Sequence, residues 1–274
     1  MSEDQLPVGF DAELASRSER AKRQKWGRFT LAALGAIPWI GSVISAFAAL
    51  HGEKAQGEVN DLQQGWLQSH AERIQELEAT LSGIIETAEG GGAEGEARLE
   101  DPSYLKLVEH GFRVWDAAPT ENKRQQVRRI LSNATVAKLS GDDLLRLFLT
   151  WVDQYDDVHF NLISALHRET GLTGSELWQE IDGRDVRHDS SDADLFKLIL
   201  RDLSTGGVIR QHREVTGDGR MLRQKRGKGS ASSPYLSSAL EGDKPYELTQ
   251  LGHLFVGYAL DEPSRALEGI ASSQ

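Results

Sequence analysis

The residues best placed to do chemistry lie in the stretch WVDQYDDVHF, residues 151–160. On a helix, Asp153 would share a face with Asp156 and Asp157, because residues three and four apart are neighbours. Such a face, with His159 beside it, could hold a divalent cation through its carboxylate oxygens. No matching base or nucleophile stands nearby in the sequence. We therefore interpret these residues as a solvated helix face and assign no catalytic residue and no metal ligand.

Other routes to enzymatic chemistry find no support in the sequence. The chain has no cysteine, which excludes disulfides, thiolate metal sites and cysteine nucleophiles. It also lacks the phosphate-binding pattern GxxxxGK[ST], the nucleophile pattern GxSxG and the zinc pattern HExxH. We predict a protein that is not an enzyme and needs no cofactor.

A basic loop near the C-terminus is the strongest candidate for binding a partner. The net charge of −11 argues against a basic field over the whole chain, but this loop opposes its basic side chains with only Glu214 and Asp218. Such a loop could lie along a nucleic-acid backbone or contact an acidic protein partner, or remain a solvated loop. The basic residues of this predicted wing are Arg210, Arg213, Arg220, Arg223, Lys225, Arg226 and Lys228.

Residues 29–50 form an apolar segment, FTLAALGAIPWIGSVISAFAAL, without a single charge. As a straight helix it would reach roughly 33 Å, against about 30 Å for the hydrocarbon core of a bilayer. The tail before it, residues 1–28, carries a basic cluster suited to the cytoplasmic side or to an anionic membrane surface. We predict a cytoplasmic protein that associates conditionally or permanently with the inner membrane.

Two features of this segment argue against a simple permanent span. Pro38 in its middle would kink or break a helix, and a single span with an inside N-terminus would place the whole C-terminal part outside the cytoplasm. The alternative is a kinked helix or helical hairpin buried in a bundle or oligomer core. Small residues at four-residue spacing favour close helix packing and a homo-oligomer. The residues predicted for membrane contact and self-association are Ala32, Ala36, Pro38, Trp39, Gly41, Ser45 and Ala49.

The middle of the chain predicts two helical regions separated by a linker. Residues 51–88 predict an acidic amphipathic helix with Leu77, Leu81 and Ile84 on its apolar stripe. Residues 89–100 are rich in glycine and predict a linker. A helical region, residues 101–139, follows, and Asp101 with Pro102 suits the start of its first helix.

Residues 140–262 predict a separate domain, followed by a flexible tail over residues 263–274. Its first helix is expected to run from Ser140 to Leu166, and Thr173 with Glu176 forms a capping box for the next. A third helix, a strand, a loop, a second strand that ends in Thr249 and a last helix, which Thr249 would cap, complete the order. The stretches LILRDLSTGGVI and YELTQLGHLF resemble bacterial winged-helix domains, which implies a fold more than a function.

The helix that would read DNA in such a domain, Ser191–Leu203, is poorly suited to phosphates. It carries Asp192, Asp194 and Asp202 against Lys197 and Arg201. The predicted fold is thus mainly α: an N-terminal apolar helix or hairpin, a long acidic helix, and a helical domain that ends in a winged-helix-like module with a small β-wing.

The arrangement over residues 20–90 resembles bacterial abortive-infection-type membrane effectors. It combines a basic tail, an apolar segment interrupted by proline and glycine, and an acidic helix. The resemblance implies a defence or toxin-like protein that oligomerises and perturbs the inner membrane, with the C-terminal domain as a sensor or docking module. Two competing predictions are a winged-helix nucleic-acid-associated or regulatory protein whose apolar segment forms an oligomer core, and a scaffold subunit with neither activity.

Overall fold

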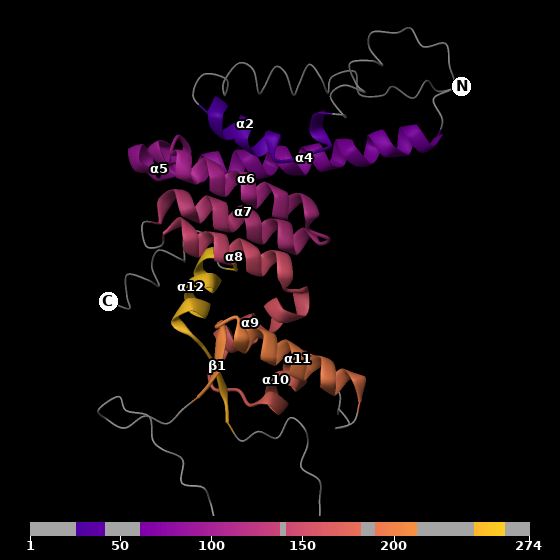
Figure 1. Ribbon diagram of the computed structural model, residues 1–274, viewed down its shortest axis with the longest axis vertical. Coiled ribbons are helices and arrows are strands. Elements are labelled where there is room, and N and C mark those ends of the chain that lie inside the picture. The colour runs from indigo at the N-terminus through magenta and orange to yellow at the C-terminus, as the bar shows by residue number, and fades with distance from the viewer. Residues whose placement is uncertain (1–25, 42–60, 138–140, 182–189, 213–243, 261–274) are drawn as a thin grey trace, which may run out of the picture. The chain divides into compact units, whose positions relative to one another are not determined.

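The structure is a computed structural model of the chain, and it describes residues 26–41, 61–137, 141–181, 190–212 and 244–260 (Figure 1). The chain divides into two compact units, Met1–Asp153 and Gln154–Gln274. The described residues are mainly helical, with one small two-stranded sheet. The predicted fold class is confirmed at this level.

The first unit is a helical bundle. Its long helices lie side by side in Figure 1, and α7 packs against α4, α5 and α6, while α2 packs against α6. Its helices are α2 (Gly27–Gly35), α4 (Asp61–Gly90), α5 (Gly92–Leu99), α6 (Pro102–Ala117), α7 (Glu121–Val136) and α8 (Asp142–Gln154).

Large side chains from several helices fill the core of this bundle. On α6, the aromatic residues Tyr104, Phe112 and Trp115 are all buried, as their helical spacing predicts. The Tyr104 hydroxyl donates a hydrogen bond to the Leu131 carbonyl of α7 at 2.8 Å. The apolar stripe predicted for α4 is also confirmed, because Leu77, Leu81 and Ile84 are buried.

The helices of this unit begin where short polar side chains satisfy free backbone N–H groups. The Asp101 carboxylate accepts a hydrogen bond from the Ser103 N–H at 2.8 Å, and Pro102 occupies the first helical position of α6. Thr120 caps α7 in the same way, accepting from the Lys123 N–H at 3.3 Å. The predicted helix start at Asp101 and Pro102 is therefore confirmed.

The predicted glycine-rich linker over residues 89–100 is wrong, because these residues are almost entirely helical. Gly92 adopts a φ of +68° and allows a tight turn between α4 and α5. Gly95 packs so closely on α4 that an added Cβ would lie 2.2 Å from the Ala88 carbonyl oxygen. The glycines serve a sharp turn and close helix packing, and Leu99 at the end of α5 is buried.

The second unit contains α9 (Asp157–Arg168), α10 (Gly174–Ile181), α11 (Ser191–Thr205), β1 (Ile209–Gln211), β2 (Tyr246–Leu248) and α12 (Gln250–Ala259). The two strands are antiparallel, with Ile209 opposite Leu248 and Gln211 opposite Tyr246. Helix α9 packs against α10, α12 and β2, and α11 packs against β1.

The domain predicted to begin at residue 140 with one long helix needs a correction. The helix ends at Gln154, and a new helix, α9, begins at Asp157. Asp156 is extended, and its N–H donates a hydrogen bond to Nδ1 of His159 at 3.1 Å, which completes a capping box. The compact second unit accordingly starts at Gln154, and residues 141–153 belong to the first unit.

Several local predictions in the second unit are confirmed. The Thr173 N–H donates to the Glu176 carboxylate at 2.7 Å, as a capping box requires. Thr249 caps α12 and accepts from the Gly252 N–H at 3.0 Å. In the core, the rings of Phe160 and Phe255 stack with their centroids 6.1 Å apart.

Candidate functional site at the apolar segment

The described part of the apolar segment is short and bent. Helix α2 ends at Gly35, and the Ala36 and Ile37 N–H groups close tight turns onto the carbonyls of residues 33 and 34. Pro38 follows directly, and a residue before proline is driven out of helical geometry. The interruption predicted at Pro38 is confirmed. In the described parts of the chain, none of the helices is both long enough and apolar enough to cross a membrane.

The apolar face of this segment lies in the core of the first unit. Phe29 and Ala33 are fully buried, and Ile37 and Ile40 are nearly so. The Phe29 ring stacks on Tyr104 of α6, with centroids 6.4 Å apart and planes 11° apart. Burial raises the pKa of Tyr104, so its hydroxyl remains protonated and can donate to the Leu131 carbonyl.

A tryptophan side chain fastens each end of this buried stretch to another helix. At the start, Trp26 Nε1 donates to Glu89 Oε1 of α4 at 3.2 Å. At the other end, Trp39 Nε1 donates to Asp116 Oδ1 of α6 at 2.7 Å. Both bonds join an indole N–H to a carboxylate, which is stronger than a bond between neutral groups. The segment is therefore held at both ends by polar bonds as well as by burial.

Asp116 is the centre of a larger group of contacts, which we call the Asp116 cluster: Trp39, His70, Arg73, Trp115 and Asp116. Arg73 Nη2 donates to the Asp116 carbonyl at 2.6 Å and lies 3.7 Å from its Oδ1. The same guanidinium sits over the Trp115 ring at 4.9 Å, and Trp39 meets the His70 ring edge-on at 5.0 Å. One carboxylate thus joins the apolar segment to both α4 and α6.

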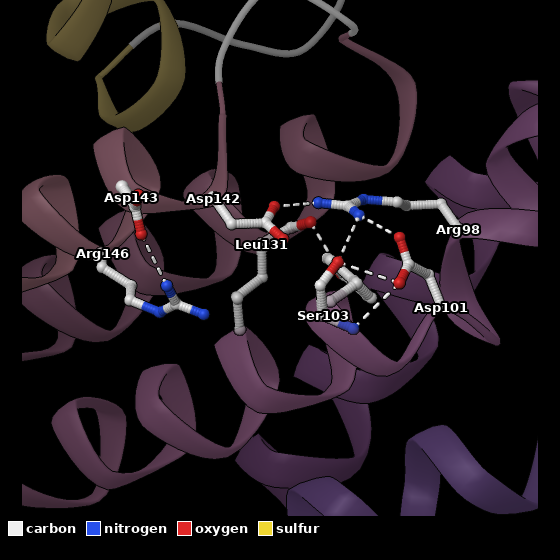
Figure 2. Close-up of polar contacts among 8 residues, drawn as sticks. Arg98, Asp101, Ser103, Leu131, Asp142, Asp143 and Arg146 are labelled. Atoms are coloured by element: carbon white, nitrogen blue, oxygen red, sulfur yellow. Dashed lines mark hydrogen bonds and ion pairs between the residues drawn. The ribbon is translucent and has the colours of Figure 1, made fainter.

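A second polar cluster, drawn in Figure 2, ties α5 to the starts of α6 and α8. Arg98 pairs with Asp101 and Asp142, donates to the Ser103 hydroxyl at 3.2 Å and lies over the Tyr104 ring. The backbone hydrogen bond from Ser103, together with the Arg98 charge, lowers the pKa of Asp101. Arg98 holds three helices together on the same ring against which Phe29 stacks.

The residues predicted for membrane contact and self-association have different environments. Ala36 is buried, Ala32 and Trp39 are half-buried, and Pro38 and Gly41 are exposed. Because α2 ends at Gly35, these small residues do not form one continuous helical stripe. Ser45 and Ala49 lie outside the described residues.

Of the predicted basic wing, the structure describes Arg210 alone. Its Nε donates to Glu247 Oε1 across the two strands at 2.7 Å, and His212 Nδ1 lies 3.0 Å from the other oxygen. The hydrogen bond with His212, followed by that with Arg210, lowers the pKa of Glu247. Arg210 thus takes part in an ion pair within the sheet. The remaining predicted residues, Arg213, Arg220, Arg223, Lys225, Arg226 and Lys228, lie outside the described residues.

The acidic stretch around Asp153 serves the chain's own architecture. Lys123 Nζ donates to the Asp153 carbonyl at 3.1 Å and joins α7 to α8, while His159 accepts the Asp156 N–H in the cap of α9. Over the described ranges, no group of three or more histidine and acidic side chains is arranged to hold a metal ion.

Sequence reasoning missed the residues that hold the apolar segment. Glu89, Arg73 and Asp116 lie far from the segment along the chain, so no local spacing marks them as its partners. Comparison with known proteins adds no further residue. The chain matches no family model, no curated protein and no solved structure.

Proposed function

We propose that this protein is a non-enzymatic bacterial defence or toxin-like effector that keeps its apolar segment inside the first unit at rest. On release, the segment contacts the inner membrane and self-associates there. The observation that carries this proposal is the way residues 26–40 are held. They include the first part of the uncharged segment 29–50, their apolar face is buried in the bundle, and a tryptophan–carboxylate hydrogen bond lies at each end of this shorter stretch.

Transfer of the apolar segment from the bundle into lipid costs little free energy, because both environments exclude water. Burying a large apolar side chain such as Phe29 or Ile37 is worth about 1.5–3 kcal/mol relative to exposing it to water. A lipid core accepts the same side chains about as well as a protein core, so release into lipid recovers much of that loss. The Asp116 cluster then adds polar bonds that lipid cannot replace, and these bias the segment toward the bundle.

For the second unit, we propose a winged-helix-like sensor or docking module. Support comes from the order of α9, α10, α11, β1, β2 and α12 and from the antiparallel pairing of the strands. A direct role in reading nucleic acid is less favoured, because α11 exposes Asp192 and Asp194 and the described wing residue Arg210 is paired with Glu247.

The burial of the apolar segment also fits the competing function, a regulatory or nucleic-acid-associated protein whose segment is only a core element. Vesicle leakage separates the two. The variant Asp116→Ala removes the carboxylate that accepts from Trp39 and pairs with Arg73, so it should loosen the segment. We expect it to release dye from vesicles containing anionic phospholipid faster than the wild type does.

A second substitution tests whether the apolar segment itself enters the lipid. Gly41 is exposed, and a Cβ added there meets no atom within 4 Å, so Gly41→Asp fits the resting fold. In a membrane, a carboxylate near the middle of the segment costs about 2.5–3.5 kcal/mol. Asp116→Ala with Gly41→Asp should therefore leak little. Gly141→Asp, at an equally open glycine outside the segment, is the matched control and should leave leakage unchanged.

The competing function predicts a different pattern. If the segment is only a core element, Asp116→Ala lowers the stability of the first unit without any leakage. Leakage that persists unchanged with Gly41→Asp would also contradict the membrane proposal, because the segment would then not be the part that enters lipid.

A further inference from the structure

Helix α4 carries acidic side chains on the face that the other described helices do not cover. Glu72, Glu78 and Glu86 are exposed, and no ion pair joins any of them to another described residue. Glu72 and Glu86 are fourteen residues apart, close to four helical turns, and Glu78 lies to one side of the line between them. Leu77 and Ile84, on the opposite face of the helix, are buried in the bundle. We call Glu72, Glu78 and Glu86 the α4 acidic face.

The basic residues of α4 and α5 are engaged with other helices. Residues 61–100 contain nine acidic and two basic residues. Of the two bases, Arg73 donates to the Asp116 carbonyl of α6, and Arg98 pairs with Asp142 of α8. The outer side of α4 therefore keeps a negative charge that these bases do not balance.

Helix α7 contributes two bases beside the α4 acidic face. Arg124 Nε lies 3.1 Å from Glu76 Oε2, and the Arg128 guanidinium packs over Gly83. Both contacts join α4 to α7 on one flank of α4. Within the described residues, neither base forms an ion pair with the α4 acidic face.

A strongly basic stretch of the chain, which we call the basic tail, joins the bundle at one end of this face. It carries five basic side chains and a single acid over residues 17–25, and the basic ones are Arg17, Arg20, Lys22, Arg23 and Lys25. The residue that follows, Trp26, is buried, and its Nε1 donates to Glu89 Oε1 in the last turn of α4 at 3.2 Å. Nine extended residues span about 30 Å, whereas Glu89 and Glu72 are about 26 Å apart along the helix. The basic tail is therefore long enough to reach every carboxylate of the α4 acidic face.

We propose that the basic tail lies along the α4 acidic face at rest, and that anionic phospholipid competes with this face for the same basic side chains. The occupant is this stretch because its charge is opposite to that of the face and because Trp26 fixes its end there. Exposed ion pairs are individually weak, but the tether at Trp26 gives the tail a high effective concentration at the face. The contact itself needs no membrane, whereas its displacement by lipid rests on the proposed function.

Limited proteolysis of the full chain without lipid tests the contact. Trypsin cleaves after the basic residues of the tail, and its cleavage after those of residues 213–228 provides an internal standard in the same sample. In the triple variant Glu72→Gln, Glu78→Gln and Glu86→Gln, the tail should be cleaved at least about threefold faster than in the wild type, relative to that standard. High salt should remove most of this difference, because it screens exposed charges.

A second triple variant controls for net charge. Asp153→Asn, Glu169→Gln and Asp192→Asn neutralise three exposed acids outside the α4 acidic face and should leave cleavage of the tail as in the wild type. The proposed contact is overturned if the tail is cleaved equally fast in all three proteins, or if the control variant accelerates cleavage as much as the neutralised face does.

A distance measurement checks where the tail lies. The chain has no cysteine, so Ser18→Cys in the tail and Gln75→Cys on α4, between Glu72 and Glu78, give two unique positions for spin labels. Double electron–electron resonance should show a shorter and narrower distance distribution in the otherwise wild-type chain than in the chain with the neutralised face. The same distribution in both chains would overturn the contact.

Vesicle binding tests the competition with lipid. Neutralising the α4 acidic face frees the tail, so this variant should bind vesicles of phosphatidylcholine and phosphatidylserine at least about threefold more tightly than the control variant of equal net charge, measured by co-sedimentation. Equal binding of the two variants would overturn the competition and leave the contact to be judged by proteolysis. The leakage expected of Asp116→Ala does not depend on the α4 acidic face, so this proposal and the proposed function can fail separately.

Discussion

The two units place their apolar residues in opposite ways. The first unit takes an uncharged segment, residues 29–41, and covers most of its apolar face, with polar bonds to helices 63 and 77 residues away in the chain. The second unit has a helix with charges along its length, α11, and leaves Leu195 and Leu198 in solvent. The more apolar region is the buried one, as hydrophobicity along the sequence predicts, but hydrophobicity does not predict that two leucines of the charged helix are exposed. What decides the outcome is whether distant side chains are present to cover an apolar face.

This difference suggests a division of roles. In the first unit, Trp26, Trp39 and Arg98 join elements that are distant in sequence, so the bundle and its apolar segment should unfold together. In the second unit, Thr173 and Thr249 cap single helices, and Thr249 also donates to the Gly207 carbonyl at 2.6 Å. The first unit buries the apolar face of residues 29–41, whereas the second unit leaves Leu195 and Leu198 of α11 exposed.

The largest expected effect tests how firmly the first unit holds the segment. Phe29→Ala removes a fully buried ring that stacks on Tyr104 and should lower the free energy of unfolding by about 3–5 kcal/mol. Leu31→Ala, two residues along the same helix but 72% exposed, should change it by less than about 0.5 kcal/mol. Chemical denaturation measures both. Equal effects would mean that α2 does not pack on α6 as described.

A smaller effect tests the polar ties of the first unit. Arg98→Ala breaks contacts with Asp101 and Asp142 and the packing on Tyr104, so we expect a loss of about 1–2 kcal/mol. The neighbouring pair in Figure 2, Arg146 with Asp143, is far more exposed. Arg146→Ala should therefore cost less than about 0.5 kcal/mol. A similar cost for both variants, measured by denaturation, would remove the proposed role of Arg98 in joining three helices.

The smallest effect concerns the second unit and its response to pH. Burial, followed by the charge of His167, lowers the pKa of His253, which Glu247 partly offsets. The unfolded chain therefore binds this proton more readily, so the contribution of His253 is complete above pH 6.5 and declines as the pH falls through the lower folded value. We expect His253→Gln to lose less thermal stability than the wild type between pH 7.5 and pH 5. A steeper decline in the variant would contradict the assigned direction.

Local patterns in the sequence predict much of the fold. The apolar stripe of α4, the caps at Asp101, Thr173 and Thr249, and the two short strands all depend on residues close together in the chain. Two local predictions were wrong: the linker over residues 89–100 and the single helix from Ser140 to Leu166. Gly92 and Gly95 allow a tight turn and close packing where a flexible linker was expected, and the Asp156–His159 cap begins a new helix where one continuous helix was expected.

The candidate site was harder to predict than the fold. The presence of Pro38 correctly indicated a bend, and burial was one of two predicted environments for the segment. Its partners Glu89 and Asp116 could not be found, because a bond between residues more than sixty positions apart leaves no local spacing to recognise. The exposure of Leu195 and Leu198 on α11 could not be predicted either, because their helical spacing is also that of an ordinary buried stripe.

A single fluorescent probe can follow the proposed movement of the apolar segment out of the bundle and into lipid. The natural chain has no cysteine, so Gly41→Cys offers a unique site for a polarity-sensitive dye at an open position. In the Asp116→Ala background, we predict that anionic vesicles shift the dye's emission to that of an apolar environment, while a dye at Gly141→Cys does not respond. If the emission at position 41 stays that of water with vesicles present, the segment does not enter lipid and the effector proposal is wrong.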